Sequence, residues 1–340
     1  MAHGAADSKT RVDERGDTER CAHIVLYRSD GSDQDLALEA IAPPEDDDDL
    51  LWVDIDCDAP DLIGDVARRL GLPEAAHPRL LETGSAPQLH SYGDHLVIQA
   101  VVVEHVGDLR FEGTVLTIAS GPDFVLTVHD RPIGFIRAIR KREHGETRLG
   151  MLDEESFVVS LLDWQLGSYF EAVSDFERAV ERLEEDVLRD RHDESTRELS
   201  RLRKGASRLR RMLAPHRRLF ASLARPDFHP EGEDTVGPHF VRVYENFERA
   251  MDVVENAREL VIGSFELFTN QIALRTNNAM RMLTFATVVI GCQTVIAGVL
   301  GMNFDAPFFE TAARGFWIAI GAMLVVTACA VVLGKRRGWF

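Results

Sequence analysis

Small, hydroxylated and amide residues run through an otherwise apolar segment near the end of the chain. Leu283 to Leu300 carries no charged side chain, and a helix needs roughly 20 apolar residues to cross the hydrocarbon core of a bilayer. Steps of three and four residues bring the polar positions onto one helical face, which predicts a polar stripe on a membrane-spanning helix. The stripe comprises Asn277, Met280, Thr284, Thr287, Gly291, Thr294, Gly298 and Gly301.

Two interpretations of this stripe are open. Gly and Thr let transmembrane backbones approach closely, so the stripe could pack against another helix. Alternatively, several copies of the helix could surround a pore, with the stripe as its wall and the amides of Asn277 and Asn303 at its two ends. Neutral oxygen atoms can hold a cation through its water shell without trapping it. The second interpretation therefore predicts a cation pore.

A second apolar segment follows at residues 315–334, and it is also close to the length that spans a bilayer. Basic residues lie just before the first span, at Arg275 and Arg281, and just after the second, in residues 335–340. The positive-inside rule then places both ends of the membrane part in the cytoplasm.

The loop of residues 303–314 is expected on the outer side of the membrane. Its acids, Asp305 and Glu310, would raise the local cation concentration at the mouth of the pore. The first span itself has no carboxylate that would hold a divalent ion too long for fast flux. No nucleotide-binding or phosphorylation motif is found, so the sequence favours passive uptake and predicts neither an enzyme nor a cofactor.

A very long helix is expected to lead into the first span, the two together covering residues 236–302. Pro238 suits the first turn of a helix, and no proline follows until Pro307. Apolar residues alternate three and four apart, which is coiled-coil spacing. They are Tyr244, Phe247, Met251, Val254, Val261, Phe265, Phe268 and Ile272. A single helix cannot bury this seam on itself, so the spacing predicts self-association.

A helical hairpin is expected within residues 151–230. Its first arm, about 155–189, is rich in Asp and Glu, and its second arm, about 195–224, is rich in Arg. A basic arm alone would suit nucleic acid or lipid headgroups. We favour mutual neutralisation of the two antiparallel arms, and the net charge of −18 over 340 residues also argues against nucleic acid as a partner.

An α/β domain is expected at residues 21–150. The preceding tail, residues 1–20, has no apolar core and is predicted to be disordered. Within the domain, β-branched runs between turn signals predict strands. They are HIVLYR, LLWVDID, HLVIQAVVVEHV, TVLTIAS and FVLTVHD.

Alternate aspartates occur at the end of the second of these runs. Asp54, Asp56 and Asp58 imitate the start of a calcium loop, but Ala59 stands where such a loop requires Gly. A helix N-cap at Asp58 is the alternative that we favour. The four cysteines occur singly, so the spacing predicts neither a disulfide framework nor a zinc motif.

The end of the first span resembles the CorA group of magnesium transporters. GMN at residues 301–303 stands at the outer end of the first of two spans, after MRMLTFATVV and TVIAG. SLLDWQLGSYF and LEEDVL in the hairpin and, more loosely, the segment from LWVDID to HPRLLE are also similar. The resemblance implies a funnel-shaped homo-oligomer, a pentamer in that group, which takes up Mg²⁺ and also Co²⁺ across the plasma membrane.

The resemblance also implies roles for single residues. A selectivity filter would consist of Gly301, Met302 and Asn303, and the Asn303 amide would hold the ion through its water shell. A hydrophobic gate would consist of Met280, Leu283 and the residue at position 291. Here position 291 is a small Gly, and Cys292 replaces the usual proline, which departs from the expected gate.

Regulation is where the sequence departs further from the group. There, acidic residues at subunit boundaries bind cytoplasmic Mg²⁺ and hold the pore closed. Glu82 is kept here, but Thr83 and Arg242 stand at the two boundary positions. A direct pair between Arg242 and an acid such as Glu82 would then replace the metal. The alternative is a local shift of the alignment, with Glu245 as the boundary acid.

Two other functions stay open at this point. One is a Zn²⁺ transporter of the related ZntB group, whose outer motif departs from the GMN kept here. The other is a membrane-anchored binding or sensing module whose two spans only tether it.

Overall fold

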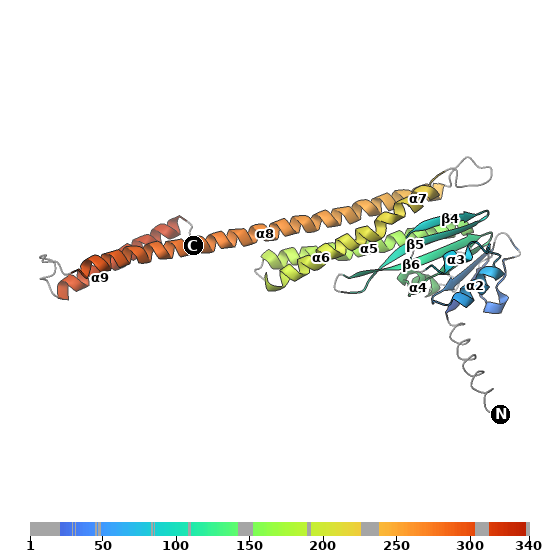
Figure 1. The fold of residues 1–340 in the computed structure, drawn as a ribbon, viewed down its shortest axis with the longest axis horizontal. Coiled ribbons are helices and arrows are strands. Elements are labelled where there is room, and N and C mark those ends of the chain that lie inside the picture. Colours follow the sequence, from blue (N-terminus) through green and yellow to red (C-terminus); the bar gives the residue numbers. More distant parts are fainter. Residues whose placement is uncertain are drawn as a thin grey trace, which may run out of the picture. The chain divides into compact units, whose positions relative to one another are not determined.

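The structure is a computed structural model, and two compact units make up the chain, Met1–Ile262 and Gly263–Phe340 (Figure 1). It describes residues 21–28, 30, 32–44, 46, 49–82, 84, 86–107, 110–141, 152–188, 192–225, 238–302 and 313–337. The prediction of a disordered tail at residues 1–20 falls outside the described residues.

A mixed seven-stranded sheet forms the centre of the first unit, in the order β2-β1-β3-β7-β6-β5-β4. Its strands are β1 (Ala22–Tyr27), β2 (Gln34–Asp35), β3 (Leu50–Ile55), β4 (Gln88–Tyr92), β5 (His95–His105), β6 (Phe111–Gly121) and β7 (Phe124–Val128). Only the pair of β3 and β7 is parallel among these described strands. The five predicted strands are confirmed, whereas β2 and β4 were not predicted.

Each face of the sheet packs against helices. Leu51, Val53 and Ile55 alternate along β3 and lie in one core with the apolar side of α2 (Pro60–Arg69) and with α3 (His77–Leu80). Trp52, on the opposite face, packs edge-on against Phe157 of α5 (Glu154–Leu188), with ring centroids 5.6 Å apart. Two-residue alternation therefore explains how one strand supplies two cores.

The predicted N-cap of α2 is wrong by one residue. The helix begins at Pro60, so Ala59 is the N-cap, and no side chain caps the helix there. Proline fits the first helical position because its missing N–H would have no partner there anyway. Two further short helices of this unit are η1 (Leu38–Ala40) and α4 (Gly134–Lys141).

The predicted hairpin is confirmed, although its second arm is interrupted. The first arm is α5. The second arm consists of α6 (His192–Leu213), the 3-10 turn η3 (Ala214–His216) and α7 (Arg217–Leu223). Pro215 lies in the turn, where a residue without a backbone N–H breaks the α-helical ladder. Ion pairs link this basic arm to the long helix α8 (Pro238–Leu300), through Arg210–Glu255 at 2.7 Å and Arg217–Glu248 at 3.2 Å. Neutralisation of the arm is therefore not confined to the acidic α5.

The seam predicted on α8 is wrong for its first half. Phe247 and Val254 are 0% and 1% exposed within the single chain. Phe247 stacks on Phe220 of α7, with ring centroids 5.0 Å apart. The protomer's own helices thus cover this face, and no second copy is needed to bury it. Phe265 and Ile272, farther along, are 52% and 45% exposed and stay available for self-association.

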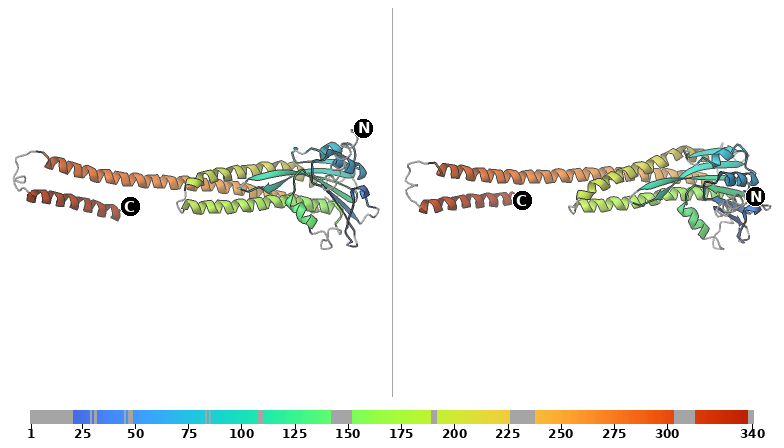
Figure 2. Two further views of the ribbon diagram at one scale, coloured as in Figure 1. Left: turned by 90° about the horizontal axis from the view of Figure 1, so that it is seen from below. Right: turned by 60° about the horizontal axis from the view of Figure 1, so that its bottom comes forward.

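The second unit contains the end of α8 and helix α9 (Ala313–Arg336), which lie side by side (Figure 2). Both helices are long and apolar enough to cross a membrane. The expected single helix from the stalk into the first span is confirmed, and the second span also agrees with the prediction.

Candidate ion pathway

One face of α8 packs on α9 within the second unit. Its less exposed positions recur three and four apart, namely Phe285, Val289, Gln293, Ile296 and Leu300. The matching positions of α9 are mostly small, namely Gly315, Ala319, Met323, Thr327, Ala330 and Gly334. Small residues let two transmembrane backbones approach closely. Within the single chain, the small residues that pack against another helix are therefore those of α9, and not those of the stripe on α8.

The predicted polar stripe of α8 lies on the opposite side. A helix turns about 100° per residue, which places the stripe roughly half a turn away from the face that contacts α9. All its positions are exposed in the single chain, and so is Leu283. These are Asn277, Met280, Thr284, Thr287, Gly291, Thr294, Gly298 and Gly301. The chain thus leaves the stripe uncovered.

A polar contact fixes the rotation of α8 against α9. Gln293 Nε2 donates to the carbonyl oxygen of Met323 at 2.9 Å and to the Thr327 hydroxyl at 2.8 Å. Interhelical hydrogen bonds of this kind orient helices where water is absent. Sequence reasoning missed Gln293, although it is the only amide between Leu283 and Leu300.

The threonines of the stripe are bonded to their own helix. The hydroxyls of Thr284, Thr287 and Thr294 each donate to the carbonyl four residues earlier, at 2.8 Å. This common arrangement satisfies the O–H group without a partner from another helix. The hydroxyl oxygens therefore remain on the exposed face without holding the helix to a neighbour.

The glycines of the stripe differ in the space around them. A Cβ added at Gly291 or Gly298 would meet no atom within 4 Å, so the protomer alone does not require glycine there. A Cβ at Gly301 would lie 3.3 Å from the Ala297 carbonyl oxygen, which is tight. Gly301 follows the last residue of α8, and its N–H still donates to that carbonyl, at 2.9 Å. Glycine there suits the close turn that ends the helix.

Several predicted site residues fall outside the described part of the chain. Asn303, Asp305 and Glu310 follow the last described residue of α8, and Thr83 is also undescribed. The filter is thus described only as far as Gly301 and Met302.

The three predicted boundary residues each have a defined surrounding in the single chain. Arg79 Nη1 donates to both carboxylate oxygens of Glu82, at 3.0 and 3.1 Å. Arg242 Nη2 lies 3.8 Å from Asp163 Oδ2 on α5, and Glu245 is exposed. Within one chain, Glu82 and Arg242 therefore have different partners.

A buried ionic cluster closes the end of β3. The Asp54 carboxylate contacts the Thr127 hydroxyl and the Arg140 guanidinium, and His129 Nε2 lies 3.2 Å away. Arg140 also reaches Asp56 Oδ2 at 3.0 Å. Burial alone would raise the pKa of Asp54, but the contact with His129 and then the charge of Arg140 hold this pKa below its ordinary value. An arginine thus pairs with two of the three carboxylates of the apparent calcium loop, and the described residues contain no group of three or more metal ligands.

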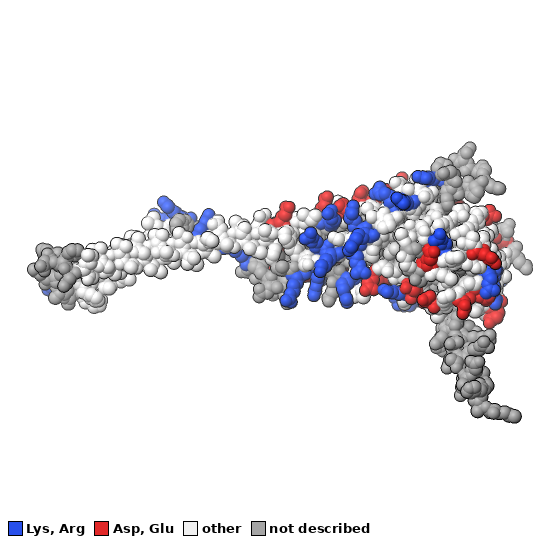
Figure 3. All heavy atoms as spheres, viewed as in Figure 1, with Lys and Arg blue, Asp and Glu red and all other residues white. Residues whose placement is uncertain are grey.

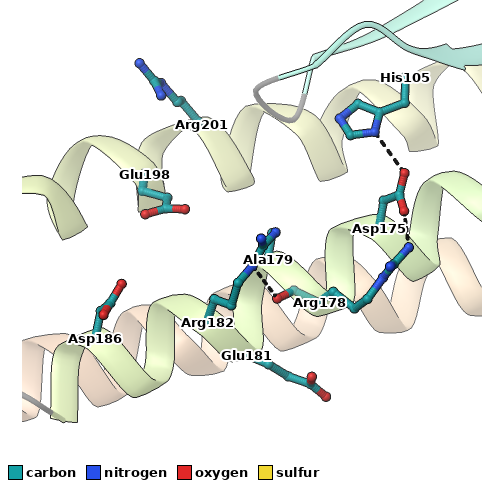
Figure 4. Close-up of a pocket in the computed structure, with 9 residues that line it drawn as sticks. All are labelled: His105, Asp175, Arg178, Ala179, Glu181, Arg182, Asp186, Glu198 and Arg201. Atoms are coloured by element: carbon teal, nitrogen blue, oxygen red, sulfur yellow. Dashed lines mark hydrogen bonds and ion pairs between the residues drawn. The ribbon is translucent and has the colours of Figure 1, made fainter.

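A hollow of about 650 Å³ lies beside the hairpin (Figure 4). Its lining mixes acids with arginines from α5 and α6. Asp175 is already bonded to His105 Nδ1, at 2.8 Å, and to Arg178. Four acids face three arginines there, so the excess of negative charge is small, and the stripe on α8 is the better candidate site.

Comparison with known proteins identifies the family of this chain. A sequence model of the CorA-like Mg²⁺ transporter protein family matches residues 47–336. The cobalt/magnesium transport protein CorA of Thermotoga maritima is 24% identical over 281 residues, which cover 81% of this chain and 80% of that protein. The protein of the same name from Methanocaldococcus jannaschii is 22% identical over 328 residues, 93% of this chain and 99% of that protein.

Solved structures show the same fold. The complete CorA magnesium transporter from Methanocaldococcus jannaschii aligns with a TM-score of 0.72 at 19% identity, over 94% of this chain and 98% of that one. The full-length CmaX protein aligns with a TM-score of 0.68 at 21% identity, over 92% and 96% of the two chains. Since the family model spans most of the sequence, this chain belongs to the CorA-like Mg²⁺ transporter protein family and is a transporter rather than an enzyme.

Proposed function

We propose that several copies of this chain, five by resemblance to the CorA group, form a pore through which hydrated Mg²⁺ enters the cell passively. The stripe of α8 lines the pore, and residues 301–303 form its outer filter. The observation that carries the proposal is the position of the stripe, which is exposed and lies opposite the face that contacts α9. Helix α9 would then face lipid, and the stripe would face the other copies.

The chemistry of the stripe suits a hydrated divalent cation. A bare ion cannot enter hydrocarbon, because its Born cost is tens of kcal/mol. The paired part of α8 and α9 is almost free of charged side chains (Figure 3), so the wall offers neutral oxygens rather than carboxylates. Neutral oxygens hold the water shell of Mg²⁺ without trapping the ion. The amide of Asn303 and the carbonyl of Gly301 would do so at the filter.

The membrane potential supplies the driving force in this proposal. An inside-negative potential of 100 mV is worth about 2.3 kcal/mol per elementary charge, hence about 4.6 kcal/mol for Mg²⁺. This energy sustains a gradient of more than a thousandfold, since about 1.4 kcal/mol corresponds to a factor of ten. No coupled energy source is required. Both termini would lie in the cytoplasm and the protein in the plasma membrane.

Adjacent tryptophan substitutions test the wall of the pore. Gly298→Trp places a large ring on the stripe, at a position where the protomer leaves open space, and Mg²⁺ flux into proteoliposomes should fall to that of empty liposomes. Val299→Trp is the matched control, because Val299 is 55% exposed and points about 100° away. Equal flux in wild type and Gly298→Trp, at equal incorporation, would show that the stripe does not line the pathway.

Ion competition tests the identity of the cargo. The cytoplasmic domain of ZntB from Vibrio parahaemolyticus shares the fold at 18% identity, so Zn²⁺ is the relevant competitor. We expect Mg²⁺ flux to be reduced by Co²⁺ and much less by Zn²⁺. Zn²⁺ flux exceeding Mg²⁺ flux would contradict the proposal.

The boundary residues give the pore a closed state that depends little on cytoplasmic Mg²⁺. Arg242 is held only loosely, at 3.8 Å from Asp163, so its guanidinium can turn toward an acid such as Glu82 of another copy. Patch recordings with cytoplasmic Mg²⁺ titrated to millimolar levels should show shallow closure, and Arg242→Ala should open the pore further. Arg249→Ala, an exposed arginine of the same helix, is the control. Steep closure that ignores Arg242→Ala would show that Glu245 or another acid still binds the metal.

A further inference from the structure

Two cysteines that are far apart in the sequence meet at one end of the sheet. Cys21 directly precedes β1, and Cys57 follows the end of β3. The two strands are antiparallel neighbours, in which Ala22 pairs with Ile55. The pairing continues for one more residue, because the Asp56 N–H donates to the Cys21 carbonyl oxygen at 3.0 Å.

The turn after β3 brings the two side chains into contact. The Ala59 N–H donates to the Cys57 carbonyl oxygen at 3.1 Å, which bends the chain directly after the strand. The Cys57 thiol then lies beside the Cys21 thiol, which contributes to raising its pKa. Cys21 lies opposite Asp56, so Cys57 is its diagonal neighbour across two strands about 4.8 Å apart. Disulfides join Cα atoms about 4.4–6.8 Å apart. Neither cysteine is in a disulfide and both are only partly buried, so an oxidant can reach them.

We propose that Cys21 and Cys57 form a disulfide site that responds to peroxide. The thiolate of one cysteine attacks H₂O₂, which gives a sulfenic acid and hydroxide. The second thiol then attacks the sulfenic sulfur and forms the S–S bond, and its proton leaves with the sulfenic hydroxyl group as water. The proton that the first thiol lost on becoming a thiolate neutralises the hydroxide. In sum, two thiols and one H₂O₂ give one disulfide and two molecules of water.

The surroundings of Cys57 indicate which sulfur reacts first. Burial, then the contact with Cys21 and the charges of Asp56 and Asp58, raise the pKa of the Cys57 thiol to about 12. Cys57 therefore stays protonated at neutral pH and is a poor first nucleophile. Cys21 should form the sulfenic acid, and Cys57 should resolve it.

The link would act on the segment that carries a proposed boundary residue. Cys57 and Asp58 line a small cavity together with Leu81 and Glu82. A disulfide at Cys57 would fix one wall of this cavity and would also close the chain between residues 21 and 57. Closing a chain segment restricts the unfolded state, so the oxidised protein should be more stable.

Thiol counting on the full chain tests this site. In detergent micelles, a Cys292→Ala/Cys329→Ala background leaves only the two cysteines of the sheet. Stoichiometric H₂O₂ should protect both from maleimide after denaturation, within a single chain, and dithiothreitol should restore both. The oxidised protein should unfold at a temperature several degrees higher than the reduced one.

Serine variants on the same background separate the two roles. Cys57→Ser should leave a sulfenic acid on Cys21 that dimedone labels, whereas Cys21→Ser should label far less. The proposal would be overturned if the two cysteines were oxidised independently of each other or if disulfides formed only between chains. It would also be overturned if both thiols still reacted with maleimide under conditions in which dimedone labels Cys21 of Cys57→Ser. The readout does not depend on ion transport, so it stands apart from the proposed function.

Discussion

The two halves of α8 share one spacing and use it differently. In the first half, up to Ile262, the positions that recur three and four apart are aromatic or aliphatic and are buried by α7 and other helices of the same chain. In the second half, the positions of the stripe are small or polar except for Met280, and all of them stay exposed. Spacing therefore identifies a helical face, whereas residue type and the neighbouring elements determine what covers that face.

The largest expected effect concerns the exposed half, at its outer end. Asn303→Ala should abolish Mg²⁺ uptake without changing assembly, because the filter would lose its amide oxygens and the core would lose nothing. Flux into proteoliposomes at equal protein content measures it. Asn278→Ala, which removes the same amide beside the stripe, should conduct like wild type. Full uptake by Asn303→Ala would refute the filter assignment.

The buried half should respond in stability instead. Phe247→Ala removes a fully buried ring that stacks on Phe220, and such truncations cost about 3–5 kcal/mol. For a unit of this size the loss corresponds to roughly 10 °C in unfolding temperature. Val241→Ala, on an exposed side of the same helix, should change the unfolding temperature by less than about 2 °C. If Phe247→Ala left the unfolding temperature unchanged but dissociated the oligomer, this face of α8 would have to lie at the interface between copies.

A histidine beneath the buried half should make it sensitive to acid. His216 Nε2 accepts the Val101 N–H at 2.9 Å, and its Nδ1–H donates to Leu213 at 3.1 Å. Burial lowers the pKa of His216 to about 4, against about 6.5 in an unfolded chain. The native state holds the ring neutral, so the contribution of His216 to the free energy of unfolding is fully present above about pH 6.5. This contribution falls as the pH drops toward 4, by up to about 3 kcal/mol.

The difference in melting between wild type and His216→Gln isolates this contribution. It should shrink as the pH is lowered from 7 to 4, while groups elsewhere affect both proteins equally. A difference that is constant over this range would mean that His216 is not kept neutral in the folded protein.

A smaller effect is expected where the exposed half of α8 meets α9. Gln293→Leu removes both hydrogen bonds to α9, and interhelical bonds in membranes are worth about 0.6–2 kcal/mol. Thr327→Val removes one partner and should cost less. Thermal unfolding in detergent compares the two, and a larger cost for Thr327→Val would contradict the assignment of Gln293 as the shared donor.

The smallest effect belongs to the external acids. Asp305→Asn with Glu310→Gln should slow uptake modestly at low salt, because surface charges act within a Debye length of about 8 Å at physiological ionic strength. The difference from wild type should disappear at high salt. A deficit that persists there would place these acids in direct contact with the ion.

Local patterns predicted the elements well. The strands in HIVLYR and LLWVDID follow from β-branched runs between turn signals, and the hairpin and both spans follow from the length and spacing of their charged and apolar segments. The contacts between elements were harder to predict from the sequence. The seam at Phe247 is covered by α7, a short helix that follows the interruption of the second hairpin arm at Pro215. The contact of Cys21 with Cys57 depends on the register of β1 and β3, and such register is not visible in spacing. The stripe itself was found, but its orientation away from α9 required the contacts of Gln293.

In the proposed pore, the back-bonded threonines would present only hydrogen-bond acceptors. The hydroxyl protons of Thr284, Thr287 and Thr294 are donated to backbone carbonyls, so each side chain offers only oxygen lone pairs to the pore. Water around a cation points its hydrogens outward and would find an acceptor at each of these three positions. Chloride, whose hydration water points its oxygens outward, finds no donor among these three. A wall without a single charge can thus discriminate between anions and cations.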